Sequence, residues 1–118
     1  MSEGKSILKE KSFLFALRVV KLYKLLCEEK REFVMSKQLL RSGTSVGANI
    51  REAQNAESKA DFIHKLAISQ KECDETLYWL ELLFHSDYLT EIEFNSLNNH
   101  ATELLKMLRS AILTTKKK

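Results

Sequence analysis

The segment RSGTSVGANIREA, from Arg41 to Ala53, contains Gly43 and Gly47, two of the three glycines in the chain. Phosphate-binding loops follow the spacing G-x-x-x-x-G-K-[ST] between a strand and a helix. Here only three residues separate the glycines, no lysine follows Gly47, and no strand-like segment precedes Gly43. The dinucleotide-binding spacing G-x-G-x-x-G is also missing. The segment therefore does not predict a phosphate site, and it favours a helix made of small residues.

Such a helix would place the small residues Gly43, Gly47 and Ala48 on one side. Each glycine costs about 1 kcal/mol relative to alanine within a helix. Two glycines in one helix therefore indicate either close approach to a neighbouring backbone or a local kink. Ser45 and Asn49 are four residues apart and share a helix face. We expect them to hydrogen-bond with each other, with the backbone or with an adjacent helix.

Three glutamates are the candidates for acid–base chemistry: Glu52, Glu72 and Glu75. Catalysis would require a pocket and shifted pKa values, and the sequence indicates neither. We interpret these glutamates as salt-bridge partners of nearby basic residues. The candidate basic partners are Arg41, Arg51 and Lys71. The residues that we group as a structural polar motif are Arg41, Ser45, Asn49, Glu52, Glu72 and Glu75.

The histidines do not predict a metal site. Di-iron bundles use two Glu-x-x-His pairs and two further glutamates. This chain offers only Asp61-x-x-His64, while His85 and His100 have no matching partner. No local signature of a Ser–His–Asp or Cys–His catalytic group is recognisable either. We expect no metal and no cofactor, and we expect His64 to be a surface or interface residue.

The elements that carry these residues are predicted to be helices. The 118 residues include no proline and only three glycines, whereas all-β folds need many such residues for their turns. Apolar residues at steps of three and four predict helices over 6–31, 36–56, 59–85 and 91–113. We expect one domain over 1–118, an all-α antiparallel up-down-up-down four-helix bundle, with a flexible basic tail at its C-terminus.

Polar residues before three of these ranges predict helix caps. Ser36 and Ser58 are candidate N-caps, because a serine hydroxyl can accept a hydrogen bond from a free amide of the first turn. Thr90 and Glu93 have the spacing of a capping box. Within the third predicted helix, Tyr78 and Trp79 are adjacent and must face different ways. The outward-facing aromatic residue is a candidate interface anchor.

The first predicted helix is apolar around most of its circumference. Between residues 13 and 28 its polar residues form one narrow stripe, which consists of Arg18, Lys21, Lys24 and Glu28. A helix on the surface of a monomer needs an apolar face of only about 100°. One face can pack inside its own bundle, and the opposite face then needs a second partner. Another copy of the same chain is the simplest such partner, so we expect a homo-oligomer.

Charge and cysteine content limit the partners and the compartment. The net charge is +3, with basic residues concentrated in the first half of the chain. Cys27 and Cys73 lie in apolar helical patterns and predict buried free thiols, with a disulfide as the alternative. No apolar run approaches the roughly 20 residues of a membrane span, and the charged start is unlike a secretory signal. These features predict a cytoplasmic protein with no membrane partner.

The segment from Gln38 to Leu83 contains a distinctive set of residues, which are Arg41-Ser42, Ser45-Val46, Asn49-Ile50 with Glu52, Asp61-Phe62, and Glu72 with Glu75. In these residues it resembles the bacterial four helix bundle proteins, also called 23S ribosomal RNA intervening-sequence proteins. The resemblance implies a four-helix bundle that assembles as a homopentamer, with no established catalytic residues. A related branch, the accessory variability proteins of diversity-generating retroelements, forms a basic pentameric barrel associated with a reverse transcriptase and nucleic acid.

These observations predict a non-enzymatic homo-oligomer that binds RNA or DNA through basic surface residues. Such binding would be indifferent to base sequence and would weaken steeply with salt. The alternative function is a structural scaffold that binds a partner protein without nucleic acid. An enzyme would require a deep pocket lined by the three glutamates. The candidate contacts to nucleic acid are Lys5, Lys9, Lys11, Arg18, Lys21, Lys24, Lys116, Lys117 and Lys118.

Overall fold

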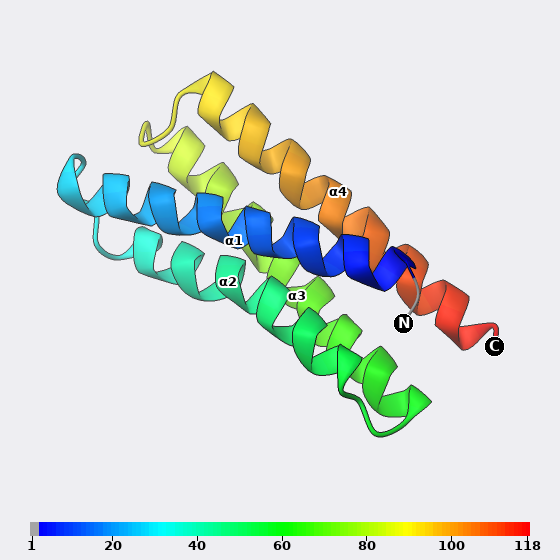
Figure 1. Ribbon diagram of the computed structural model, residues 1–118. Coiled ribbons are helices and arrows are strands. Elements are labelled where there is room, and N and C mark those ends of the chain that lie inside the picture. Colours follow the sequence, from blue (N-terminus) through cyan, green and yellow to red (C-terminus); the bar gives the residue numbers. More distant parts are fainter. Residues whose placement is uncertain (1–2) are drawn as a thin grey trace.

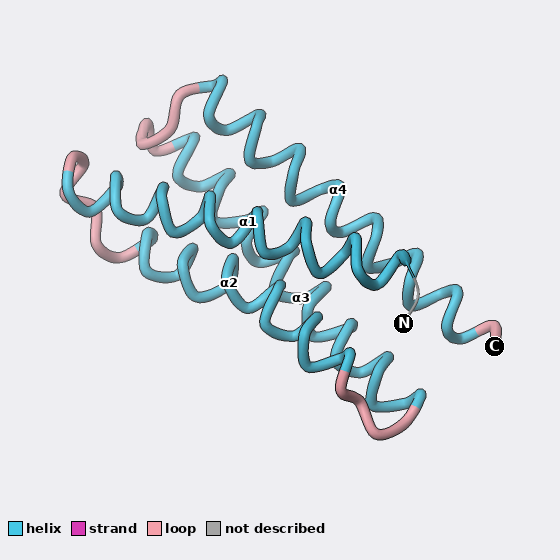
Figure 2. The backbone as a smooth tube through the Cα atoms, viewed as in Figure 1, coloured by secondary structure: helices cyan, strands magenta, loops and turns pink. Residues whose placement is uncertain are grey.

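The computed structural model describes residues 3–118, with side chains from residue 7 onward. These residues form the helices α1 (Glu3–Glu28), α2 (Met35–Gln54), α3 (Lys59–His85) and α4 (Glu91–Lys116). Successive helices run in opposite directions and pack into an elongated bundle of 47 × 21 × 19 Å (Figures 1 and 2). Each helix contacts two neighbours, so α1 and α3 occupy opposite corners. The predicted all-α four-helix bundle is confirmed.

Only α3 has the predicted bounds at both ends, since α1 and α2 differ from the prediction by one to three residues at each end and α4 differs at its C-terminal end. α1 ends at Glu28, before the predicted residue 31, because Arg31 takes a left-handed backbone conformation (φ 55°) that a helix cannot continue. α4 continues to Lys116, so the predicted flexible tail beyond residue 113 is wrong for residues 114–116. No glycine or proline interrupts this last stretch, and Thr115 Oγ1 donates a hydrogen bond to the carbonyl oxygen of Ala111 at 2.8 Å.

Two of the three predicted caps are confirmed. Ser58 Oγ accepts a hydrogen bond from the backbone N–H of Asp61 at 3.0 Å and so starts α3. At the start of α4, Thr90 Oγ1 accepts from the N–H of Glu93 at 3.1 Å, and the Glu93 carboxylate accepts from the N–H of Thr90 at 2.8 Å. These local hydrogen bonds fix the residues at which α3 and α4 begin, and so fix where the chain returns to the bundle.

The predicted cap at Ser36 is wrong. α2 begins at Met35, and the carboxylate of the buried Glu32 accepts the backbone N–H groups of Val34, Met35 and Ser36 at 3.1, 3.0 and 2.7 Å. Burial raises the pKa of Glu32, but the bonds from these amides outweigh burial and hold that pKa below its ordinary value. The negative charge of a carboxylate is also favourable at this place, because the N-terminal end of a helix is the positive end of its dipole.

The core runs the length of the bundle. Both cysteines are free, as the favoured interpretation predicts, but only Cys73 is buried and Cys27 is half-buried. Burial raises the pKa of the Cys73 thiol to about 12. Among residues 3–118, none of the helices has an apolar stretch sufficient to span a lipid bilayer. The largest fully buried aliphatic and aromatic side chains are Phe15, Leu26, Leu39, Leu66, Leu80, Leu83, Leu104 and Leu108.

Candidate interaction surfaces

The two glycines of α2 bring α1 close to it. A Cβ atom added to Gly43 would lie 2.8 Å from both methyl groups of Val19, and one added to Gly47 would lie 3.3 Å from Ser12 Oγ. Close helix approach, rather than a break, therefore explains the glycines, since α2 is continuous. Ala48 is exposed and does not share this side, because it lies about 140° around the helix from Gly43.

Buried hydroxyl groups connect α2 to α3. Thr76 Oγ1 lies 3.0 Å from Ser42 Oγ, and Ser69 Oγ donates a hydrogen bond to the carbonyl oxygen of Val46 at 2.8 Å. Among the described side chains, no buried nitrogen or oxygen atom lacks a hydrogen-bond partner. Ser42 is one of the residues that carry the family resemblance, but this contact with Thr76 was not predicted, although both residues lie where the helical period places a buried side chain. Their hydroxyls fix how α2 and α3 pack.

Half of the polar motif forms one cluster on the surface between α2 and α3. The Arg41 guanidinium bonds the carboxylate of Glu72 at 2.9 Å and also pairs with Glu75. The indole N–H of Trp79 donates to Glu75 at 3.0 Å, and this bond together with Arg41 lowers the pKa of Glu75. Beside it, Tyr78 is 57% exposed and packs edge-on against Trp79, with ring centroids 5.0 Å apart.

The other motif residues bond elsewhere. Ser45 Oγ donates to the carbonyl oxygen of Arg41 at 2.6 Å, and Asn49 Nδ2 donates to the carbonyl oxygen of Ser45 at 2.9 Å. Both side chains therefore bond the backbone of their own helix. Glu52 pairs with Lys65 at 2.9 Å, and not with any of the three predicted basic partners. Four of the six residues, Arg41, Glu52, Glu72 and Glu75, thus take part in ion pairs between α2 and α3, whereas Ser45 and Asn49 do not.

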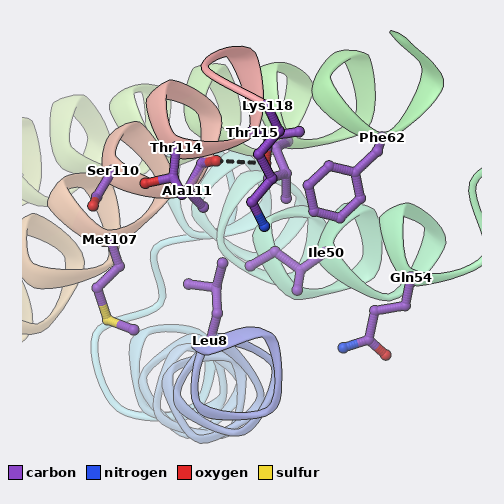
Figure 3. A pocket seen from close by; sticks show the side chains of 11 residues that line it. Leu8, Ile50, Gln54, Phe62, Met107, Ser110, Ala111, Thr114, Thr115 and Lys118 are labelled. Atoms are coloured by element: carbon purple, nitrogen blue, oxygen red, sulfur yellow. Dashed lines mark hydrogen bonds between the residues drawn. The ribbon is translucent and has the colours of Figure 1, made fainter. Parts of the chain in front are cut away.

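A cavity of about 340 Å³ opens at the end of the bundle that carries the N- and C-termini. Figure 3 shows Leu8 of α1 opposite α4 residues such as Ala111, with Ile50 of α2 and Phe62 of α3 completing the apolar lining. Lys118 and the hydroxyl groups near the end of α4 supply its polar edge. Among the described residues, no Asp, Glu or His side chain lines the cavity, so the three candidate glutamates lie outside it. The described lining therefore offers no pair of side chains for acid–base catalysis.

The histidines lie far from any metal-binding arrangement. His64 and His85 are exposed. His100 packs edge-on against Phe15, with ring centroids 5.0 Å apart, and its Nδ1 lies 3.1 Å from Arg18 Nη1. Burial and then the charge of Arg18 lower the pKa of His100. In the described part of the chain, no three His, Cys, Asp or Glu residues gather as metal ligands.

Two of the candidate nucleic-acid contacts are occupied in packing α1 against α4. Lys11 forms an ion pair with Glu103. Arg18 donates a hydrogen bond to Ser96 Oγ at 2.6 Å in addition to its contact with His100. Both side chains therefore have partners within the chain.

The remaining basic candidates fall into two groups. Lys9 follows Leu8, which lines the cavity together with Lys118, so Lys9 and Lys116–Lys118 belong to the same end of the bundle. Lys21 and Lys24 are exposed farther along α1. Except for Lys5, whose side chain lies outside the described residues, none of these lysines forms an ion pair with another described residue. The predicted contacts thus do not make one continuous patch.

The outer side of α1 exposes apolar side chains. Ile7 is 42% exposed, Phe13 and Leu14 are each 48% exposed, and Leu17 is 51% exposed. The Arg51 guanidinium of α2 lies 5.3 Å from the centre of the Phe13 ring, but it leaves that ring half open to solvent. The bundle therefore covers only one side of α1, and the second apolar side that the sequence indicates remains uncovered in a single chain.

Comparison with known protein families identifies the family of this chain. The family model described as 23S rRNA-intervening sequence protein matches residues 5–110, which is most of the chain. The chain belongs to the 23S rRNA-intervening sequence protein family. Its relatives include a protein of unknown function from the S23 ribosomal protein family of Bacteroides thetaiotaomicron, whose crystal structure is solved. The two chains share 57% sequence identity and a TM-score of 0.92, over 92% of this chain and 97% of that one.

The 23S rRNA-intervening sequence family is the one that the segment from Gln38 to Leu83 resembles, so that identification is confirmed. No curated protein matches the chain. The family description and the related structure supply a fold and no activity. Function must therefore be argued from the exposed surfaces of the bundle.

Proposed function

We propose that this member of the 23S rRNA-intervening sequence family is a non-enzymatic homo-oligomer, and that the oligomer is a pentamer. The observation that carries the proposal is the apolar group on the outer side of α1, whose members are 42–51% exposed. Exposed apolar side chains that gather on one side of a helix, as these do around the exposed Glu10, are typical of interaction sites. Burying it between copies would remove it from water, which is the main favourable contribution to association. The pentamer itself follows from the family resemblance.

Light scattering over a range of micromolar concentrations tests the oligomer. We expect the wild-type mass to be five times that of one chain. Leu14→Asp with Leu17→Asp should shift the mass toward one chain without unfolding it, because both side chains are about half exposed. Ile92→Asp is the matched control, since Ile92 on α4 is 83% exposed and lies outside the α1 surface. A wild-type protein that remains monomeric throughout would rule out the proposal.

We further propose that the assembled protein binds RNA or DNA at the end of the bundle that carries both termini. Lys9 and Lys116–Lys118 lie there, and they are free of ion pairs with other described residues. Lysines bind phosphates regardless of base sequence, and their affinity falls as salt rises. Repeating this end in several copies would raise the avidity for a long polyanion, because later contacts form within the same complex.

Filter binding to an RNA and a DNA oligonucleotide at several salt concentrations tests this surface. Replacing Lys116, Lys117 and Lys118 by Gln should weaken binding. It should also reduce the slope of log K against log salt concentration by about 0.7–0.9 for each lost phosphate contact. The matched control replaces three exposed lysines elsewhere, which are Lys30, Lys37 and Lys106. Equal losses from both variants would indicate a response to net charge alone. If the wild-type protein retains neither oligonucleotide on the filter at low salt, the result would instead favour a scaffold that binds a partner protein.

A further inference from the structure

The outer face of α1 changes character along the helix. Its first half exposes apolar side chains such as Leu14 and Leu17, whereas its second half exposes the ammonium groups of Lys21 and Lys24. Neither lysine is paired with an acidic group in the described part of the chain. An exposed glutamate, Glu28, follows Lys24 by one turn. We call the surface formed by Leu14, Leu17, Lys21 and Lys24 the α1 face.

The opposite corner of the bundle carries a surface of opposite charge. Asp74, Tyr78 and Glu81 are exposed at successive turns of α3, and we call them the α3 face. Neither carboxylate forms an ion pair with another described residue, and the exposed Lys71 precedes Asp74 by one turn. Tyr78 is held in place by its edge-on contact with Trp79. Fixed aromatic side chains of this kind anchor protein interfaces.

Contacts inside the bundle place these two faces at the same height. Val19 of α1 packs against Gly43, and the residue before Gly43 hydrogen-bonds with Thr76 of α3 at 3.0 Å. Val19 and Thr76 therefore lie at similar positions along the bundle. Because α1 and α3 run in the same direction (Figure 1), the two lysines that follow Val19 lie level with the acidic and aromatic residues around Thr76.

We propose that the α1 face of one copy packs against the α3 face of a second copy, in the same orientation. Lys21 and Lys24 would then meet Asp74 and Glu81, and Tyr78 would anchor the contact. The inference rests on the proposed self-association, and it goes further by naming two unlike surfaces and their pairing. Complementary charges at matching heights steer association and fix its register.

One copy can use both faces at once, because α1 and α3 occupy opposite corners and do not contact each other. Each copy would then contact two others through unlike surfaces, which is the arrangement that generates rings or filaments. A contact between two α1 faces would use only one side of the bundle. Assembly would then stop at a dimer, and the charged residues of α3 would take no part in the contact.

Charge reversal tests the pairing. One variant combines Lys21→Glu with Lys24→Glu, a second combines Asp74→Lys with Glu81→Lys, and a third carries all four changes. Each double variant should raise the concentration needed for half-assembly by about tenfold or more in low salt, because like charges would then face each other. The fourfold variant should recover assembly. Lys37→Glu with Lys106→Glu is the control for the lysine variant, since it lowers the net charge by the same amount at exposed sites outside both faces.

Light scattering gives the mass of each variant, and circular dichroism checks that it is folded. The milder changes Lys21→Gln with Lys24→Gln should give an intermediate loss and replace any variant that fails to fold. If the wild type assembles but the α3 reversal has no effect, or the fourfold variant does not recover, this pairing is wrong and self-association stands. A contact between two α1 faces would respond to the lysine changes alone. A monomeric wild type would overturn both proposals.

Discussion

Glu32 connects a single ionisable side chain to the start of a helix. It is only 7% exposed, yet it serves as the shared acceptor for three backbone N–H groups at the start of α2. Ser36 Oγ donates to the Glu32 carbonyl oxygen at 2.8 Å, so the backbone of Glu32 is held as well. The carboxylate thus does the work of an N-cap from outside the helix. Its charge state therefore affects how firmly the α1–α2 connection is held.

Glu32→Ala should lower the free energy of unfolding by about 2 kcal/mol at pH 7, because three helix-start amides lose their acceptor. The folded pKa of Glu32 is lowered, so its stabilisation is complete above the ordinary glutamate value of about 4.3 and is lost as the pH falls through the folded pKa. The difference from wild type should shrink over that acidic range. Urea denaturation across pH measures it.

Glu29→Ala is the control for this prediction, because Glu29 is an exposed carboxylate in the same connection. It should change stability little at any pH. A Glu32→Ala variant as stable as wild type at pH 7 would mean that the three amides are satisfied equally well by water.

The caps at Ser58 and Thr90 can be predicted from the sequence, whereas the cap that Glu32 provides for α2 was not predicted. Ser58 and Thr90 lie directly before their helices, and their bonds span only three residues, so spacing alone identifies them. Glu32 reaches α2 only because Arg31 turns the backbone into the left-handed region. Likewise, Lys65 becomes the partner of Glu52 only through the packing of α2 on α3. Residue spacing in one chain segment does not contain that information.

At the scale of helices, the seam between α1 and α2 depends on two glycines with unequal room. The space beside Gly43 is closed by the branched and fully buried Val19, whereas Gly47 faces the smaller side chain of Ser12. A methyl group at Gly43 would overlap atoms that cannot rotate away. At Gly47 a shift of a few tenths of an ångström is enough to make room.

Gly43→Ala should therefore destabilise the protein by about 1–2 kcal/mol, since overpacking costs about 1–3 kcal/mol and the helix propensity of alanine returns up to about 1 kcal/mol. Gly47→Ala should be close to neutral. Chemical denaturation of both variants measures the difference. Val19→Ala added to Gly43→Ala should recover part of the overpacking loss. Equal stability of the two glycine variants would contradict this account of the seam.

The helical period predicts the elements because apolar residues every three or four positions must be buried together. That is why α3 has the predicted range 59–85, and why the excess apolar surface of α1 is visible in the sequence. The bonds of Lys11 and Arg18 to residues of α4 could not be predicted from the sequence. Their partners lie on α4, far away in the sequence, and the rotation of α1 against α4 decides which basic side chains remain free.

At the scale of the whole molecule, assembly should make stability depend on concentration. Association that involves only the folded chain stabilises it by mass action. The thermal midpoint of the wild type should therefore rise as the protein concentration is raised. The midpoint of the variant with Leu14→Asp and Leu17→Asp should not change over the same range. Differential scanning calorimetry at several concentrations measures both, and parallel behaviour of the two proteins would argue against burial of the α1 surface between copies.

The glycine seam has a geometric consequence for such an assembly. When unlike faces join, the angle between them within one copy decides whether the series closes and how many copies it needs. Gly43 and Gly47 set how near α1 lies to α2, and α2 in turn carries α3. They therefore help to fix the direction in which the α1 face points relative to the α3 face. A methyl group at Gly43 would turn each step of the series slightly, so one atom buried inside the bundle would change the curvature of the whole ring.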